Sequence, residues 1–282
     1  MLNINIDPVA FTIGSLEIRW YGIMAAIAVA ALLVIMLREA KRLGITRDIY
    51  SIFLWGVIGG VIGGRLAYVI YYWEHFMANP REIIAFAGLA QMGMIIGIIV
   101  AALIYMAVTR MRFTTLLSIG DAFVAAAFLA LAIGRIGCTL NGCCYGQPSP
   151  FHFFPLAVIY SPRNTMAPEF WGVPLYPTQL YHVFWNLIVF GIIWGFRRRF
   201  KPEGSLFLFG FSIYAIGDLF LRFLRGSRGV TLFWGLDIPQ VVDLAILVIF
   251  LSWLIIKLRQ FKKQSLATAP ASEALPGQNQ ED

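Results

Sequence analysis

Seven long apolar runs constrain this chain of 282 residues more than any other feature of its sequence. A helix needs about 20 predominantly apolar residues to cross the hydrocarbon core of a bilayer. The runs that approach or exceed this length are residues 20–37, 50–72, 88–108, 116–133, 178–196, 205–221 and 240–256. Hydrophobic residues make up 59% and charged residues 13% of the chain, against roughly 45–50% and about 25% in soluble domains. The sequence therefore predicts an all-α, polytopic membrane protein with about seven transmembrane helices.

Lysine and arginine residues predict how these helices are oriented. They gather after the first, third, fifth and seventh runs, at residues 38–47, 110–112, 197–201 and 257–263. Loops rich in these residues stay in the cytoplasm. We therefore expect the N-terminus outside and the C-terminus in the cytoplasm. Because the basic residues flank apolar runs, membrane topology explains the net charge of +7, and no nucleic-acid partner is expected.

The runs also divide the chain. Residues 1–263 are expected to form a single transmembrane domain, with an outer loop at residues 147–177 that is rich in proline and aromatic residues. Residues 264–282 are rich in Ala, Ser, Pro, Gln and Glu, a composition typical of disorder, so a disordered cytoplasmic tail is predicted. No basic segment followed by an apolar core begins the chain, so no cleavable signal peptide is expected.

Residues 134–146 form the most unusual stretch, reading GRIGCTLNGCCYG. Arg135 stands at the predicted outer mouth of the fourth helix, and a glycine-rich turn is expected to follow it. Charged side chains in a membrane segment are costly and usually functional, and the planar guanidinium suits phosphate. Arg65, behind the glycine-rich residues 59–64, and Arg222 are candidates for the same reason. The alternative is that such arginines reach the outer headgroups.

All three cysteines of the chain lie in this stretch: Cys138, Cys143 and Cys144. On the outer side Cys138 would bond to Cys143 or Cys144, or the three would simply pack as small residues. Two further alternatives are a reactive thiol and a three-cysteine metal site, for which no nearby residue completes the ligand set. No metal and no cofactor are expected.

The same stretch resembles the signature of the bacterial prolipoprotein diacylglyceryl transferases, Gly-Arg-x-Gly-Asn-Phe-x-Asn-x-Glu-x-x-Gly. The matching residues are Gly134, Arg135, Gly137, Asn141 and Gly146. Further segments resemble the family in the same order along the chain: residues 7–11, 13–14, 20–22, 63–65 with Tyr68, and 177–181. The chain is thus identified as a divergent member of the family, and the resemblance extends up to the polar tail.

The resemblance implies the reaction. The family transfers the diacylglyceryl group of phosphatidylglycerol to the thiol of the lipobox cysteine in a preprolipoprotein, the first step of lipoprotein maturation, in the bacterial inner membrane. Partners are then phosphatidylglycerol, the lipobox segment and the bilayer. The implied catalytic residues are Arg135, Tyr21, Arg222 and His182. The implied phosphatidylglycerol-binding residues are Arg135, Asn141, Gly142, Gly146, Arg65, Gln179, Tyr181, Tyr214 and Asp218.

Several positions depart from the family pattern. Met92 stands where the family has a functionally important histidine, and methionine cannot take a proton. Cys143 replaces a glutamate, and in the sixth run Asp218 and Arg222 exchange the signs of the family's charged pair. His182 is the expected substitute base. These departures leave open a catalytically altered family member that binds anionic lipid or handles thiols. A transporter is the third alternative, although no inverted repeat is evident.

Overall fold

The computed structural model describes residues 2–14, 16–45, 49–84, 88–161, 165–166, 168–226 and 231–267. Seven of its helices are long and apolar enough to cross a membrane, as predicted. They are α1 (Trp20–Arg42), α2 (Ile49–Tyr71), α4 (Gln91–Val108), α5 (Phe113–Asn141), α6 (Thr178–Phe196), α7 (Ser205–Leu221) and α8 (Ile238–Ala267). In lipid every backbone N–H and C=O needs an internal partner, which is why these apolar runs fold as helices. The chain is a multi-pass membrane protein.

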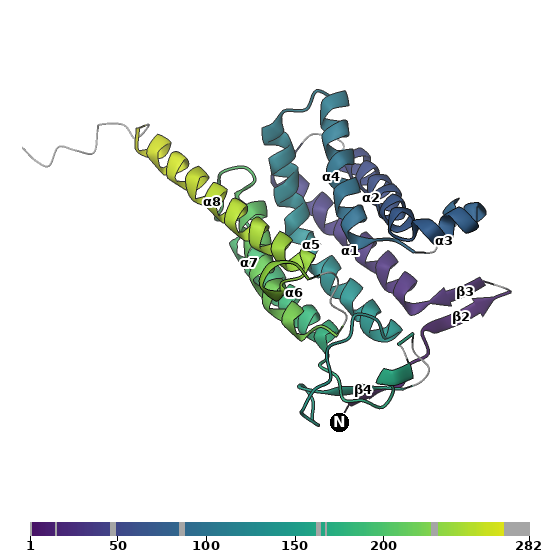
Figure 1. Ribbon diagram of the computed structural model, residues 1–282. Coiled ribbons are helices and arrows are strands. Elements are labelled where there is room, and N and C mark those ends of the chain that lie inside the picture. Colours follow the sequence, from purple (N-terminus) through teal and green to yellow (C-terminus); the bar gives the residue numbers. More distant parts are fainter. Residues whose placement is uncertain are drawn as a thin grey trace, which may run out of the picture.

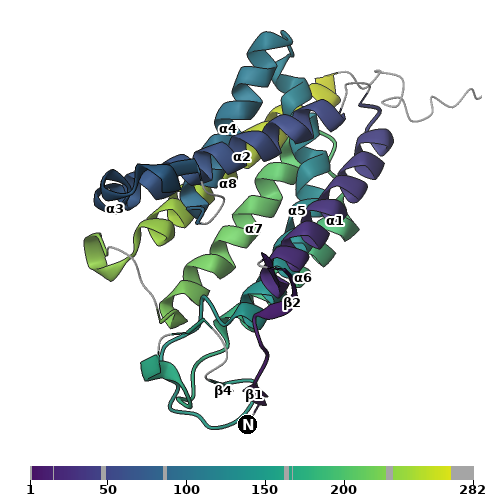
Figure 2. The same cartoon turned by 90° about the vertical axis from the view of Figure 1, so that its right-hand side faces the viewer.

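Helix α5 lies at the centre of the fold (Figure 1). It packs against α1 on one side and against α6 and α7 on another, and α8 lies along α7 (Figure 2). Buried small and apolar residues make these contacts: Val124, Ala125 and Phe128 of α5 meet Val189, Ile193 and Leu206 of α6 and α7. A second cluster of buried residues joins α1, α2 and α5: Met36, Ala40, Ile49, Ile52, Met111, Ile119 and Ala122.

Helices α2 and α4 form a closely packed pair through their glycines. A Cβ atom on Gly97 would lie 2.0 Å from the carbonyl oxygen of Gly59, and one on Gly93 would lie 2.3 Å from that of Gly63. Small residues at four-residue spacing let membrane helices approach backbone to backbone. The glycine-rich residues 59–64 therefore let α2 pack closely against α4.

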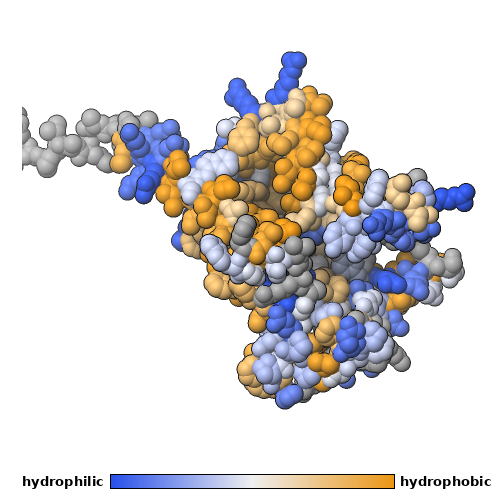
Figure 3. Space-filling model, in the orientation of Figure 1, coloured by the Kyte–Doolittle hydropathy of each residue, from blue (hydrophilic) through white to orange (hydrophobic). Residues whose placement is uncertain are grey.

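The surface agrees with a membrane-embedded bundle. Hydrophobic residues cover the sides of the helical region, whereas hydrophilic residues gather at the helix ends and on the segments below them (Figure 3). Many large apolar side chains on the helix faces are exposed, including Ile70 at 69% and Val108 at 71%. In water such a surface would aggregate, so lipid is its natural solvent.

Short strands and helices gather at one end of the bundle, called the strand end below. The strands are β1 (Leu2–Ile4), β2 (Val9–Ile13), β3 (Leu16–Arg19) and β4 (Val158–Tyr160). β1 pairs in parallel with β4, and β2 pairs antiparallel with β3. A small core of Ile4, Val158, Tyr160, Met166 and Leu175 lies under the β1–β4 pair. The remaining short helices are α3 (Trp73–Ala78), η1 (Pro80–Ile84), η2 (Pro168–Phe170), η3 (Arg222–Leu224) and η4 (Phe233–Gly235).

Two of the differences between predicted and observed boundaries change where functional residues or the tail lie. Helix α5 ends at Asn141 and not near residue 133, so Arg135 is part of the helix. Helix α8 continues to Ala267, so residues 264–267 of the predicted tail are helical, and residues 268–282 lie outside the described residues. With 29 residues and a rise of about 1.5 Å per residue, α5 is longer than a helix needs to be to cross the hydrocarbon core. Its last turns therefore reach the strand end.

Candidate functional site

The last two turns of α5 carry Arg135 and Cys138 into the strand end. The expectation of a glycine-rich turn directly after Arg135 is wrong, because the helix continues to Asn141 and turns only at Gly142, where φ is +75°. The N–H of Cys143 donates to the Cys138 carbonyl over 3.2 Å, and the N–H of Gly142 to that of Thr139 over 3.3 Å. This pair of bonds is the Schellman motif, which favours glycine at the left-handed position.

The start of α6 holds the turn that follows. Thr178 donates its hydroxyl to the Cys144 carbonyl over 2.9 Å, and the Gln179 amide donates to the Cys143 carbonyl over 2.8 Å. Both side chains are fully buried. The N–H of Gly146 donates to Tyr176 over 3.0 Å, where a Cβ atom would collide with the Tyr176 carbonyl. Residues 143–146 are therefore fixed between α5, α6 and the residues that follow α7.

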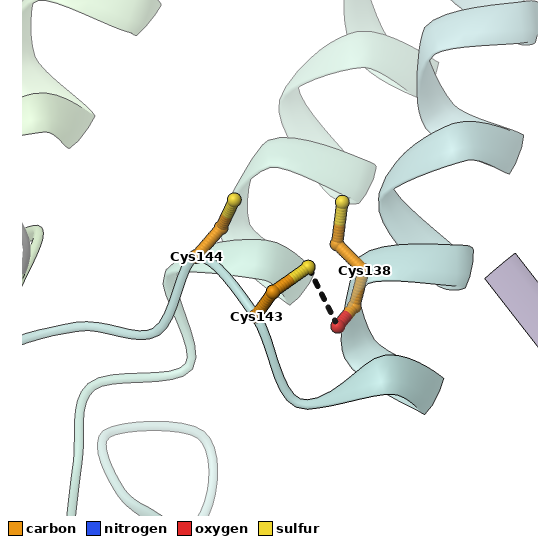
Figure 4. A group of neighbouring side chains, drawn as sticks. All are labelled: Cys138, Cys143 and Cys144. Atoms are coloured by element: carbon orange, nitrogen blue, oxygen red, sulfur yellow. Dashed lines mark hydrogen bonds between the residues drawn. The ribbon is translucent and has the colours of Figure 1, made fainter. Parts of the chain in front are cut away.

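The three cysteine thiols converge at this point (Figure 4). Their Sγ atoms all lie within 4.8 Å of one another, and all three are free thiols. The Cys143 Sγ also contacts the Cys138 carbonyl at 3.8 Å. Hydrogen bonds from the Cys138 and Cys143 thiols, helped by Arg225 and Arg135, lower the pKa of the Cys144 thiol despite its burial. The predicted disulfide stays a prediction.

Arg135 offers unused donors beside these thiols. Within the part of the chain that the structure describes, its guanidinium makes no hydrogen bond and no ion pair. It lies within electrostatic reach of Tyr214, Asp218, Cys138 and Cys144. The planar guanidinium fork, with five N–H donors, has the geometry that suits a phosphate or a carboxylate.

Tyr21 approaches from the first turn of α1. A Cβ atom on Gly137 would lie 3.5 Å from the Tyr21 Cα and Cδ2 atoms, so the glycine lets α1 and α5 meet closely at this level. Tyr21 also lies within electrostatic reach of Arg135 and all three cysteines. The structure thus brings together the predicted residues Arg135 and Tyr21.

A buried network of charges occupies the neighbouring ends of α6, α7 and α8. The Asp218 Oδ2 atom accepts from the Arg222 Nε over 2.6 Å, and its Oδ1 accepts from the Tyr214 hydroxyl over 3.2 Å. The same Oδ1 lies 3.3 Å from the His182 Nδ1. Arg222 also lies 3.4 Å from Asp243 and 3.8 Å from Asp237. The side chains of the four charged residues and of His182 are at most 8% exposed, so water does little to weaken these interactions.

Comparison with known proteins identifies the family. A family model described as prolipoprotein diacylglyceryl transferase matches residues 8–256 of the chain. The chain belongs to the prolipoprotein diacylglyceryl transferase family.

Curated relatives of this prolipoprotein diacylglyceryl transferase family member carry the same description. A Dehalococcoides mccartyi protein named phosphatidylglycerol–prolipoprotein diacylglyceryl transferase is 36% identical over 270 residues, which cover 95% of this chain and all of the relative. Proteins of that name from Listeria monocytogenes and Clostridium tetani are 33% and 32% identical, over 91% and 78% of this chain and 91% and 86% of their own lengths. The resemblance predicted from the sequence motifs is confirmed.

Several residues expected to bind lipid in this family member have other partners. The N–H groups of Gly142 and Gly146 donate within the protein, and lipid binding by these two glycines stays a prediction. Gln179 holds the Cys143 carbonyl, and Tyr181 donates its hydroxyl to the Pro155 carbonyl over 2.7 Å. Asn141 bonds to Thr165. These residues shape the site, because buried polar groups are satisfied by such bonds.

Arg65 likewise belongs to a different group. It donates from Nε to the Ile83 carbonyl over 2.9 Å and from Nη1 to the Gly88 carbonyl over 3.2 Å, and Nη2 contacts the Glu82 carbonyl. Its guanidinium also lies over the rings of Tyr68 and Phe76. These contacts fasten α2 to the segment between α3 and α4, and phosphate binding by Arg65 stays a prediction.

Sequence reasoning missed three members of the site: Thr178, Asp237 and Asp243. Asp243 carried a readable signal, because an acidic residue inside an apolar run usually has a buried partner. Asp237 directly precedes α8, and Asp237 and Gln240 exchange side-chain and backbone hydrogen bonds at three-residue spacing. That spacing is the sequence signature of a capping box.

Proposed function

We propose that this protein transfers the diacylglyceryl group of phosphatidylglycerol to the lipobox cysteine thiol of preprolipoproteins, the first step of lipoprotein maturation. Membership of the family supports this proposal, as do the names of relatives that match nearly the whole chain. The protein would act as a multi-pass transferase of the bacterial inner membrane, with phosphatidylglycerol, a preprolipoprotein and the bilayer as its partners and no nucleic acid.

The observation that carries the proposal is the uncommitted guanidinium of Arg135. The reaction breaks a bond between the glyceryl carbon and a phosphate oxygen, so negative charge grows on the departing phosphate. Donors held ready for such charge accelerate a reaction because they need no rearrangement. Arg135 lies on the last turns of α5, among Tyr21 and the cysteines, and would take this phosphate. Tyr214, Asp218 and Arg222 would form the adjacent wall.

The arrangement of the helices supports delivery from the membrane. The predicted orientation places the strand end outside, because basic residues gather at the opposite helix ends, where Glu39 pairs with Arg42 over 2.6 Å and with Arg197 over 3.3 Å. Phosphatidylglycerol and the lipobox segment would both reach the site laterally. Residues 1–263 would act as one domain, with the loop at residues 147–177 covering the site from outside.

The acceptor thiol must lose its proton, because the thiolate is the nucleophile. Met92, at the start of α4, cannot take this proton. His182 remains the candidate base, and its Nε2 atom has no hydrogen-bond partner within the described residues. It is only 2% exposed, so a base role requires that the acceptor thiol enters the bundle.

The deciding experiment measures glycerol phosphate release from phosphatidylglycerol and a lipobox peptide by the purified protein. We expect Arg135→Ala to lower the rate at least about 100-fold, the usual cost of losing one transition-state donor. Arg135→Lys should restore part of the rate, since it keeps the charge without the fork. The control is Arg198→Ala, which removes an exposed arginine at the opposite helix ends. This variant should release glycerol phosphate at the wild-type rate.

Two results would contradict the proposal. Wild-type rates in Arg135→Ala would remove Arg135 from the mechanism. If the wild-type protein releases no glycerol phosphate while the Listeria monocytogenes relative does so in the same assay, the transferase proposal fails. The alternative is then a family member that binds anionic lipid without transferring its diacylglyceryl group.

A further inference from the structure

The proposed transfer does not use the group of three thiols at the end of α5. Cys138 is 9% exposed, and Cys143 and Cys144 are partly buried. Their Sγ atoms lie within 4.8 Å of one another, whereas three thiolates around one tetrahedral zinc ion, with Zn–S of about 2.3 Å, lie about 3.8 Å apart. Side-chain rotations that draw the sulfurs together by at most about 1 Å would reach that geometry.

The backbone already holds these sulfurs in place. Cys138 is fixed by α5, and the Schellman bonds at Gly142 fold Cys143 back onto it. Thr178 and Gln179 fasten the carbonyls of the other two cysteines. Cys144 has a φ of +61°, a conformation that is uncommon for residues other than glycine. Residues held in such conformations cluster at functional sites, and here that conformation accompanies the gathering of the three sulfurs.

Nearby charges favour an anionic group at this place. Arg135 and Arg225 both lie within electrostatic reach of Cys144, and Arg135 also of Cys138. Three thiolates with one divalent ion carry a net charge of about −1, which these arginines would offset. Among the described residues, no fourth histidine, cysteine or carboxylate joins the three sulfurs. Three protein ligands and an open fourth position distinguish catalytic zinc from structural zinc.

We propose that Cys138, Cys143 and Cys144 bind one thiophilic divalent metal ion, with Zn²⁺ as the expected ion, and leave its fourth position for the acceptor thiol. Thiolate ligands select soft and borderline ions such as zinc over magnesium or calcium. The metal site rests on the three cysteines alone. Its role toward the acceptor rests in addition on the proposed transferase function.

The site would supply the activation that Met92 cannot. The acceptor thiol loses its proton to water when it becomes the fourth ligand, because a coordinated thiol is deprotonated. The thiolate sulfur then forms a bond to the glyceryl carbon. The bond from that carbon to the phosphate oxygen breaks, and its electron pair leaves with glycerol phosphate beside Arg135. The product thioether is neutral and binds metal more weakly, so it leaves the site.

The first test measures metal in the full-length protein, purified in detergent under inert gas without chelator. We expect about one zinc ion per chain by elemental mass spectrometry. Cys138→Ser, Cys143→Ser and Cys144→Ser should each lower bound zinc at least about tenfold, since even losing an outer partner of a ligand costs 10–100-fold in affinity. Thr139→Ser is the matched control, because it keeps the hydroxyl that bonds to the Arg135 carbonyl and removes no sulfur.

The second test replaces zinc with Co²⁺, whose thiolate complexes absorb through sulfur-to-metal charge transfer. A lipobox peptide should change this spectrum, and the same peptide with serine for its cysteine should not. Absence of metal in the wild type, equal metal in the serine variants, or a disulfide found by mass in protein kept under inert gas would overturn the site. Metal without a peptide response would overturn its role toward the acceptor. A metal-bound protein that releases no glycerol phosphate would instead count against the transferase function alone.

Discussion

The loss of Arg222 is expected to be costly for folding. It is the cation that faces three buried carboxylates, those of Asp218, Asp237 and Asp243, at 2.6, 3.8 and 3.4 Å. The side chains of Arg222 and Asp218 are 7% and 2% exposed. Removing one partner of a buried pair costs about 3–5 kcal/mol, because the remaining charge stays desolvated and unpaired. We therefore expect Arg222→Leu to lower the free energy of unfolding by about this amount.

The matched control is Arg19→Leu. Arg19 also bonds to a carboxylate, the Glu17 Oε2 atom at 3.0 Å, but both side chains are about half exposed. Water and ions weaken such a pair, so its loss should cost less than about 1 kcal/mol. The assay is denaturant unfolding in detergent micelles, followed by the fluorescence of the eight tryptophans of the chain.

A double variant separates charge from packing. Asp218→Asn removes one of the carboxylates, so the pair Asp218→Asn with Arg222→Leu should lose less stability than the sum of the two single variants. The reasoning is refuted if Arg222→Leu costs no more than Arg19→Leu, or if the two losses add without coupling.

Two other outcomes follow from particular contacts. Gly97→Ala should destabilise the protein by about 1–3 kcal/mol through overpacking, because its Cβ atom would meet the Gly59 carbonyl at 2.0 Å. Gly191→Ala on α6, where a Cβ atom would meet nothing within 4 Å, should leave the stability unchanged. Equal unfolding midpoints for the two variants would contradict the close packing of α2 and α4. His182→Ala should keep the rise of the transfer rate with pH if the acceptor thiol loses its proton by binding the metal. A flattened pH–rate profile would instead show that His182, as general base, takes the proton of the acceptor thiol.

The transmembrane helices could be predicted from sequence because the bilayer imposes one dominant rule. Each apolar run must satisfy its own backbone, and length alone then locates a helix. The end of α5 escaped this rule. Arg135 and the glycines around it predict the end of a membrane helix. In the structure the helix continues to Asn141, and Gly137 lets α1 pack closely against it. Only the partner helix α1 explains Gly137.

The candidate site was predictable only in part, for a similar reason. Motifs identified Arg135, Tyr21 and the Asp218–Arg222 pair, since four-residue spacing places the latter on one helix face. They could not show that Gln179 holds the Cys143 carbonyl, or that Tyr181 holds the Pro155 carbonyl. Such bonds depend on where a loop returns in space. The same holds for the pairing of β1 with β4, which joins residues 2–4 to residues 158–160.

That pairing has a consequence for how the protein is made. β1 leaves the ribosome more than 150 residues before its partner β4. At roughly 5–20 residues per second, the first strand waits on the order of 10 s while the intervening helices enter the membrane. During this interval Ile4, which ends in the small core under the strands, has no apolar neighbours from that core. The pairing of β1 with β4 would therefore report that the first four membrane helices have crossed the membrane, since a single helix that failed to cross would leave β4 on the opposite side from β1.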